Sequence, residues 1–160
     1  MKYWLLKTEP SQFSFDDLWK SKTRTTGWSE VRNYQARNLM RDDMKIGDLG
    51  FFYHSSADPT GIAGIVEIAS GPYTDPTQFD KKNEMGYDPK SKPDAPSWIQ
   101  VDVRAVRPFP KLLELSEIRK LKGLSKMVLL QRGSRLSVQP VSAAEWAIIC
   151  RAAGVSASAR

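Results

Sequence analysis

Two short stretches of the sequence gather side chains that could bind a flat, polar ligand. Residues 28–38, WSEVRNYQARN, place a tryptophan ahead of a carboxylate, two arginines and two asparagines. Residues 50–56, GFFYHSS, end an aromatic run with a tyrosine, a histidine and two serines. A pocket for a nucleobase needs a stacking surface, donors and acceptors for the base edge, and cations for the phosphate. The two stretches contain all of these groups.

Each of these residues also has a purely structural interpretation. Trp28 either packs into the core or stacks on a ligand. Asn33 either meets a base edge or caps the helix that follows it. Arg32 and Arg37 either contact phosphates or lie on a solvated helix face. His54, where a buried strand reaches the surface, is more often a hydrogen-bonded structural histidine than a ligand contact.

Catalysis has little support elsewhere in the sequence. His54 is the only histidine and Cys150 the only cysteine, so a zinc site built from these residue types is not expected. There is no G-x-S-x-G, Walker A or G-x-G-x-x-G motif. The acidic pairs at 16–17 and 42–43 fall at expected helix ends, where the helix dipole and solvent account for them. We therefore expect no catalytic residue, no cofactor and no metal ion.

Length and composition favour a single globular domain with an affinity for polyanions. The chain has 160 residues, of which 41% are hydrophobic and 10% aromatic, enough for one core of ordinary size. The net charge of +6 favours nucleic acid as a partner without requiring it. The N-terminus MKYWLLKTEP lacks the features of a signal peptide, and no apolar run is long enough to cross a membrane. We expect a monomer of the cytoplasm, or of the nucleus in a eukaryote.

The apolar pattern predicts strands separated by turns and short helices. Residues 98–106 alternate, with Ile99, Val101 and Val103 on one face. Residues 60–70 are almost wholly apolar, which is typical of a strand buried on both faces. Strands are expected at 2–9, 48–54, 60–70, 98–106 and 135–141, the last stopped by Pro140, and helices at 14–19, 33–44, 115–121, 124–133 and 142–149.

Capping residues mark the starts of the first and last of these helices. Ser14 precedes Asp17 by three positions, and Ser142 precedes Glu145 in the same way, which is typical of a helix N-terminus. Cys150 falls on the apolar face of the last helix, and we interpret it as a small core residue rather than a nucleophile.

The segment from 71 to 97 differs in character from the rest of the chain. It carries five prolines among lysine, aspartate and serine, and only PTQFDKK, 76–82, indicates a helical turn. A loop of this length in a compact domain is usually functional or mobile. Strands in hairpins with short helices between them, and no βαβ alternation, predict an α+β fold with a mixed, barrel-like sheet. We expect one domain over 1–154 and a disordered tail over 155–160.

Eight segments of the sequence resemble the successive motifs of the EVE domain family. The resemblance runs in chain order from residue 2 to residue 153 and implies a PUA-like fold, a mixed β pseudo-barrel flanked by short helices. It also implies binding of a modified base in DNA or RNA, flipped out into a pocket, without catalysis. The segments are KYWLLKTEP, WSEVRNYQARN, GDLGFFYHS, GIAGIVEI, DPTQFD, YDPKSKP, WIQVDV and RLSVQPVS.

The same resemblance implies which residues form the pocket, with the end of the first strand, residues 7–9, close by. By their charge, and not through the resemblance, Arg37, Arg132 and Arg135 are the expected phosphate contacts, which would give affinity and salt dependence without sequence specificity. The implied ligand-binding residues are Trp28, Val31, Arg32 and Asn33 on one wall, Tyr53, His54 and Ser55 on another, Asp88, Pro89, Lys90, Ser91 and Lys92 in a closing loop, and Trp98 and Ser137 at the floor or rim.

One position departs from the family pattern. Members often carry glycine where this chain has Glu30. A carboxylate there would either accept a hydrogen bond from an exocyclic amine or repel a phosphate. The departure bears on the identity of the ligand more than on the fold.

The leading hypothesis is a module that recognises a modified base, such as methylated or hydroxymethylated cytosine. Three alternatives stay open. One is an RNA-binding accessory protein in RNA modification. Another is an enzyme that acts on a nucleobase or nucleotide with His54 and Glu30 as acid and base. The third is an adaptor whose surface binds another protein.

Overall fold

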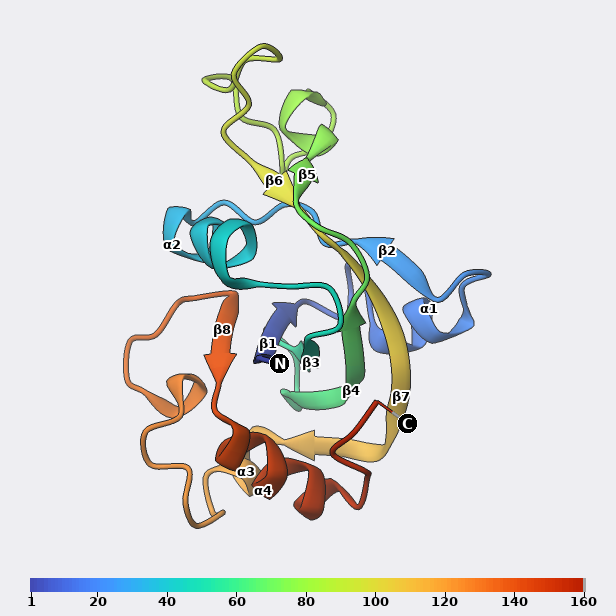
Figure 1. Cartoon of the computed structure of the whole chain (residues 1–160), viewed down its shortest axis with the longest axis vertical. Helices are drawn as coiled ribbons and strands as arrows, with labels where there is room; N and C mark the ends of the chain where they lie inside the picture. Colours follow the sequence, from blue (N-terminus) through green and yellow to red (C-terminus); the bar gives the residue numbers. More distant parts are fainter. Residues whose placement is uncertain (160) are drawn as a thin grey trace.

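A mixed six-stranded sheet, curled into a half-barrel, forms the centre of the computed structural model, which describes residues 1–159 (Figure 1). The strand order is β2-β7-β4-β3-β1-β8. Within it β1 and β3 run parallel, and every other neighbouring pair is antiparallel. The α+β class and the barrel-like mixed sheet are thus confirmed. The strands are β1 Tyr3–Thr8, β2 Thr25–Gly27, β3 Leu49–His54, β4 Gly61–Ile68, β7 Asp102–Glu114 and β8 Val138–Val141.

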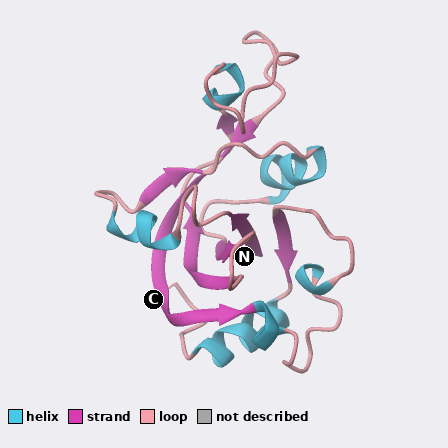
Figure 2. Ribbon diagram, turned by 180° about the vertical axis from the view of Figure 1, so that it is seen from behind, coloured by secondary structure: helices cyan, strands magenta, loops and turns pink. Residues whose placement is uncertain are grey.

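Short helices lie around the outside of the sheet (Figure 2). α2 continues into one π-helical segment, Leu39–Asp43. No helix within residues 1–159 is long and apolar enough to span a membrane. The helices are α1 Phe15–Lys20, α2 Tyr34–Asn38, α3 Leu115–Ile118 and α4 Ala143–Ala153, with 3-10 turns at Pro76–Phe79 and Val128–Leu130.

The sheet has an apolar cluster on each face. Successive side chains of a strand point to opposite faces, and β3 shows this directly. Phe52 joins the cluster that contains Trp28, whereas Phe51 and Tyr53 join the one that contains Trp146. The apolar runs of the central strands therefore reflect burial on both faces, as expected for residues 60–70.

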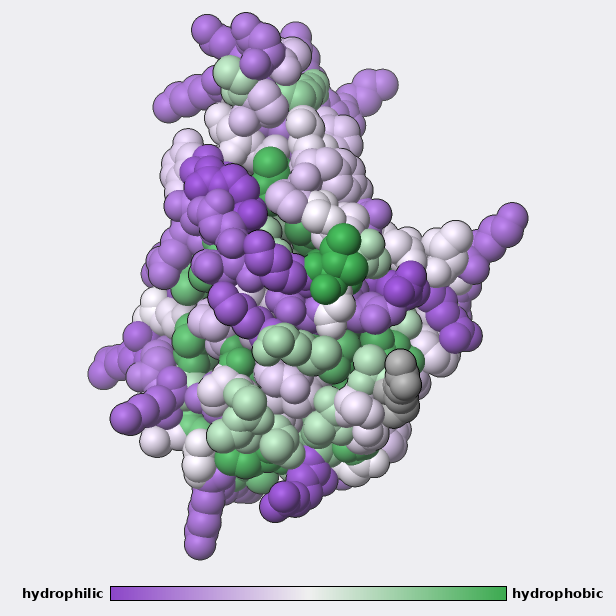
Figure 3. All heavy atoms as spheres, in the orientation of Figure 1, coloured by the Kyte–Doolittle hydropathy of each residue, from purple (hydrophilic) through white to green (hydrophobic). Residues whose placement is uncertain are grey.

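Residues between β5 (Tyr73–Thr74) and β6 (Ile99–Gln100) form a lobe that projects from the barrel (Figure 1). Its outer end carries mainly hydrophilic residues on the face seen in Figure 3. A buried glutamine holds the lobe together. Gln78 accepts hydrogen bonds from Ser91 Oγ and from the backbone of Trp98, and its Nε2 donates to the carbonyls of Asp75 and Trp98. The helical turn expected here is confirmed at Pro76–Phe79.

The C-terminal ends of two strands were predicted wrongly, because proline is tolerated on edge strands and at bulges, where its missing N–H breaks no ladder hydrogen bond. The strand expected at 98–106 is divided at Val101, and its second part, β7, continues through Pro108 to Glu114. Pro108 pairs with Gly64 between two register shifts of the β4–β7 ladder. Pro140 lies inside β8 rather than ending it, because β8 is an edge strand.

Local helix signals were read more accurately than strand ends. Ser14 with Asp17, and Ser142 with Glu145, form reciprocal capping boxes. Cys150 is buried in the core, as expected. The helices expected at 115–121 and 124–133 are reduced to α3 and one 3-10 turn.

The tail expected over 155–160 is described as far as residue 159. Trp146 Nε1 donates to the carbonyl of Ala157 at 2.9 Å, which brings this segment back against α4. Residue 160 lies outside the described residues.

Candidate functional site

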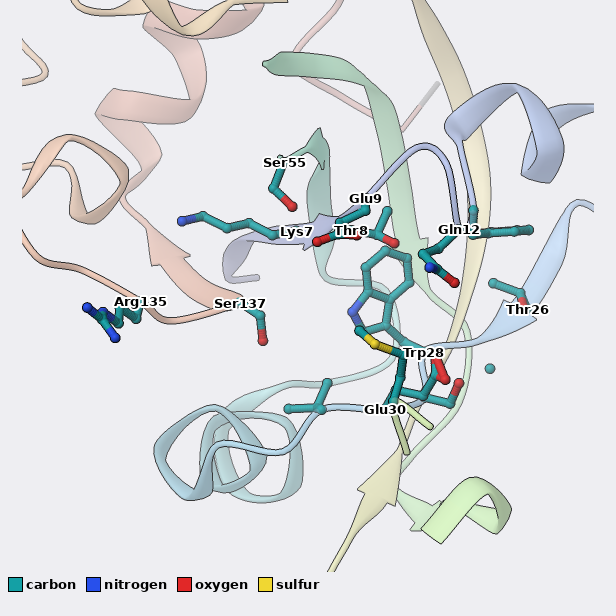
Figure 4. Close-up of a pocket in the computed structure, with 15 residues that line it drawn as sticks. Lys7, Thr8, Glu9, Gln12, Thr26, Trp28, Glu30, Ser55, Arg135 and Ser137 are labelled. Atoms are coloured by element: carbon teal, nitrogen blue, oxygen red, sulfur yellow. The ribbon is translucent and has the colours of Figure 1, made fainter. Parts of the chain in front are cut away.

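A cavity of about 510 Å³ opens at one end of the half-barrel, beneath the lobe. The close-up in Figure 4 shows Lys7 and Ser55 on one side, Arg135 and Ser137 on another, and Trp28 between them and Thr26. Its volume lies within the ordinary range for small-ligand sites. The lining residues are Lys7, Thr8, Glu9, Gln12, Phe13, Thr26, Gly27, Trp28, Ser29, Glu30, Val31, Ser55, Met85, Arg135 and Ser137.

Parallel pairing of β1 with β3 creates the polar side of this cavity. Because the two strands run in the same direction, their carboxyl ends reach the same edge of the sheet, where Thr8 pairs with His54. Ser55 N donates to the carbonyl of Thr8 at 2.9 Å, and Lys7 N donates to the carbonyl of Ser137 at 2.8 Å. Three segments far apart in the sequence are therefore joined at this edge by backbone hydrogen bonds.

Trp28 forms the aromatic wall of the cavity and is packed into the core, which agrees with the structural one of its two interpretations. The side chain is only 6% exposed and packs edge-to-face on Phe52, with ring centroids 5.4 Å apart. Its indole nitrogen has no hydrogen-bond partner within residues 1–159 and faces the side of the cavity where Ser137 lies (Figure 4). Trp28 is thus fixed by the core and still offers one N–H donor to a ligand.

Glu30 occupies an unusual backbone conformation next to Trp28. Its φ of 68° lies in the left-handed region, which favours glycine. The backbone N–H of Glu30 donates to Asp75 Oδ2 at 2.8 Å, and Arg32 Nη1 reaches the same oxygen at 3.0 Å. Asp75 is fully buried, so this part of the cavity wall is anchored to the lobe.

Charged side chains of both signs line the cavity. Glu9 and Glu30 contribute carboxylates, and Lys7 and Arg135 contribute cations. None of these four side chains forms an ion pair within the described residues 1–159. Burial lowers the pKa of the Lys7 ammonium from its ordinary value. The site therefore presents acceptors and donors that a ligand can satisfy.

Five of the residues expected at the site line the cavity together: Trp28, Val31, Ser55 and Ser137, with Arg135 from the phosphate set. Met85 was missed, although it reaches the cavity from the lobe and is 57% exposed. Glu9 and Gln12 were not assigned to the pocket either. Glu9 was expected close to the pocket, at the end of the first strand, and the pairing of β1 with β3 brings it to the cavity wall.

Arg32, Asn33 and Arg37 do not line the cavity, because other contacts occupy them. Arg32 donates to Asp75, to Thr77 Oγ1 and to the carbonyls of Val31 and Gly86. Asn33 Oδ1 accepts from the backbone of Ala36 at 2.9 Å and caps α2. Arg37 donates to the carbonyl of Ser97 and to Asn38.

Tyr53 and His54 also lie outside the cavity. Tyr53 is buried in the apolar cluster on the opposite face from Trp28. His54 Nε2 accepts a hydrogen bond from the backbone N–H of Phe15 at 3.1 Å. A ring nitrogen can accept only when it carries no proton, so this contact requires the neutral imidazole. Burial lowers the pKa of His54, and the charge of Asp17 opposes this effect. His54 lines a separate hollow beside α1.

The expected closing loop, 88–92, supports the lobe instead of lining the cavity. Asp88 accepts from Trp98 Nε1 at 2.7 Å, and this hydrogen bond is the main reason why the pKa of Asp88 is lowered. Trp98 is buried beneath Tyr34, with the two rings stacked at 4.7 Å. The remaining expected residues, Pro89, Lys90, Ser91, Lys92 and Arg132, do not line the cavity either; Ser91 is buried and the other four are exposed.

The sequence is closely similar to several known proteins. Thymocyte nuclear protein 1 of Danio rerio is 43% identical over 163 residues, which cover 91% of this chain and 69% of that protein. The human protein of the same name is 43% identical over 161 residues, which cover 90% of this chain and 70% of that protein.

Solved structures share the whole fold. A hypothetical protein from Leishmania major superposes with a TM-score of 0.90 at 45% identity, covering 96% of this chain and 95% of that one. The crystal structure of human THYN1 protein in complex with 5-methylcytosine containing DNA superposes with a TM-score of 0.89 at 40% identity, covering 98% of this chain and 99% of that one. The model of the EVE domain matches residues 2–152. The chain therefore belongs to the EVE domain family.

Proposed function

We propose that this protein is a binding module that reads 5-methylcytosine in DNA by accepting the flipped base into the cavity at Trp28. The observation that carries the proposal is the structural match, over nearly the whole chain, to human THYN1 protein in complex with 5-methylcytosine containing DNA. The cavity supports it, because it joins an aromatic wall to charged and polar side chains at one end of the sheet.

The cavity offers the contacts that a modified pyrimidine needs. Trp28, Val31, Phe13 and Met85 supply apolar surface for a ring and its methyl group. Burial of one methyl group against such a surface contributes only about 1–3 kcal/mol of discrimination. Polar groups on the rim must therefore hold the base edge in place while the apolar surface detects the methyl group.

Cations at the rim of the cavity and beyond it would contact the DNA backbone. Arg135 lies at the rim, and Arg132, Lys90 and Lys92 are exposed. Contacts of this kind weaken steeply as salt concentration rises and carry no sequence information. The protein would act where its nucleic acid lies, in the bacterial cytoplasm or the eukaryotic nucleus.

A titration of labelled oligonucleotides tests the proposal. Short DNA strands that differ only by cytosine or 5-methylcytosine at one position are followed by fluorescence anisotropy at two salt concentrations. We expect the methylated strand to bind about 5-fold or more tightly at both salt concentrations, and the difference to vanish in Trp28→Ala.

Trp19→Ala is the matched control. Trp19 stacks on Phe15 outside the cavity, so its loss should leave the preference for 5-methylcytosine intact. Equal binding of the two DNA strands by the unaltered protein would refute the proposal. RNA strands of the same sequence, tested alongside, separate DNA reading from the RNA-binding alternative.

The enzymatic alternative requires His54 and Glu30 to act on one substrate. The two residues line different hollows, and the ring nitrogen of His54 is already hydrogen-bonded to Phe15. We therefore propose a reader without turnover. Its DNA should be recovered unchanged after prolonged incubation, which mass spectrometry of the nucleosides can check.

A further inference from the structure

A reader of 5-methylcytosine faces a difficulty that the methyl group cannot solve. Thymine carries the same methyl group at the same ring position and is abundant in DNA. The two bases differ at position 4, where cytosine has an amino donor and thymine a carbonyl acceptor, and at N3, which accepts in cytosine and donates in thymine. Apolar contact alone would bind both bases equally, so polar groups of the site must also distinguish the amino group of cytosine from the carbonyl group of thymine.

The cavity contains two groups that fit an amino edge. The carboxylates of Glu9 and Glu30 both line it, and neither has a hydrogen-bond or ion-pair partner within residues 1–159. An ionised carboxylate only accepts hydrogen bonds. It therefore attracts the amino group of a cytosine and repels the carbonyl oxygen of a thymine.

The backbone holds both residues firmly. The carbonyl of Glu9 accepts from the N–H groups of Gln12 and Phe13, at 2.9 and 3.0 Å. The N–H of Glu30 is bonded to the buried carboxylate of Asp75, and its left-handed φ of 68° is maintained despite its cost for a residue with a side chain. Backbone strain of this kind is concentrated at functional sites.

Donors are available for the rest of the base edge. Cytosine presents acceptors at N3 and O2. Three donors line the same cavity: the indole N–H of Trp28, the ammonium of Lys7 and the hydroxyl of Ser137. The site thus contains acceptors for the amino group of cytosine and donors for its N3 and O2. In thymine, N3 becomes a donor and position 4 an acceptor, so the same base orientation would leave both groups mismatched.

We propose that the carboxylates of Glu9 and Glu30 select an amino pyrimidine over a keto pyrimidine, so that the cavity admits 5-methylcytosine and rejects thymine. This inference rests on the proposed function of the same site. It goes further because it identifies the groups that separate two bases with identical methyl groups.

Four DNA strands that differ at one position test the inference separately from the proposed function. Cytosine, 5-methylcytosine, uracil and thymine combine the presence or absence of the methyl group with an amino or a keto group. The ratio of affinities for 5-methylcytosine and cytosine tests methyl reading. The ratio for 5-methylcytosine and thymine tests the carboxylates. We expect the unaltered protein to bind 5-methylcytosine about 10-fold or more tightly than thymine.

Glutamine substitutions supply the decisive comparison. Glutamine has nearly the same shape as glutamate but can turn its amide to donate as well as accept. Glu9→Gln and Glu30→Gln together should reduce the ratio for 5-methylcytosine and thymine to about 2-fold or less. If one substitution alone achieves this, that carboxylate makes the contact.

Glu84→Gln and Glu117→Gln form the control pair, because they remove the same charge outside the cavity and should leave the ratio unchanged. Circular dichroism and thermal unfolding confirm that each variant is folded. The inference is overturned if the unaltered protein binds thymine as tightly as 5-methylcytosine, or if the double variant of Glu9 and Glu30 keeps the full ratio.

Discussion

The backbone N–H of Glu30 and the buried carboxylate of Asp75 are joined by a 2.8 Å hydrogen bond. The same carboxylate accepts from Arg32 and from the backbone and hydroxyl of Thr77. The fully buried side chain of Asp75 therefore holds the backbone of Glu30 at the cavity wall and compensates the charge of Arg32. It also caps the 3-10 turn of the lobe. The hydrogen bonds of Asp75 thus link the lobe to the wall of the cavity.

Replacement of Asp75 by asparagine should destabilise the protein strongly. The change leaves Arg32, whose side chain is only 19% exposed, without its ion-pair partner. Removal of one member of a buried pair costs about 3–5 kcal/mol. Urea denaturation should show a loss of that size in the free energy of unfolding. Asp94→Asn, at an exposed position of the same lobe, is the control. A loss below about 0.5 kcal/mol, as usual for surface changes, would contradict the role given to Asp75.

Glycine at position 30 should stabilise the fold. Because Glu30 has a φ of 68°, glycine relieves a backbone cost of about 1 kcal/mol. We expect Glu30→Gly to raise the free energy of unfolding by up to that amount. Ser29→Gly, one residue earlier and without a positive φ, should lower it. A stability loss in Glu30→Gly equal to that in Ser29→Gly would show that the conformation carries no strain.

The stability of the protein should fall as the pH drops below about 6.5. Burial lowers the pKa of His54 in the folded state, so the unfolded chain binds more protons between that pKa and the ordinary value. The contribution of His54 to the free energy of unfolding is therefore fully present above the ordinary pKa. It is lost as the pH falls from that value to the lower pKa of the folded state. His54→Gln should remove this dependence between pH 8 and pH 5 while keeping an acceptor for the N–H of Phe15.

Nuclear magnetic resonance gives an independent check, because His54 is the only histidine. Its Cε1–H resonance should titrate with a pKa below about 6.5. A midpoint at or above the ordinary value would contradict the half-buried, hydrogen-bonded state of the ring.

The thiol of Cys150 should be unreactive in the folded protein. Burial raises its pKa to about 11, and the thiolate is the reactive form. A colorimetric thiol reagent at pH 8 should label less than about one tenth of the native protein on the timescale in which it labels the urea-unfolded chain completely. The single cysteine makes the count unambiguous. Rapid labelling of the native state would mean that α4 opens readily.

Signals that act over three or four residues were predictable from the sequence. The capping pairs at Ser14 and Ser142, the cap at Asn33 and the buried strand at 60–70 depend on neighbouring side chains and on apolar spacing alone. The EVE domain motifs likewise placed Trp28 and Ser137 at a common site, where the structure brings them together.

Only the tertiary structure determined which polar residues face the cavity. Arg32 and His54 carry the right chemistry in the right segments, yet the lobe and α1 occupy them through hydrogen bonds to residues 39 or more positions away. Glu9 lines the cavity because β1 pairs with β3, and Met85 lines it because this part of the lobe reaches the cavity. The sequence determines which groups each side chain is able to bind. Its actual partner in the folded protein depends on long-range packing, which no local pattern encodes.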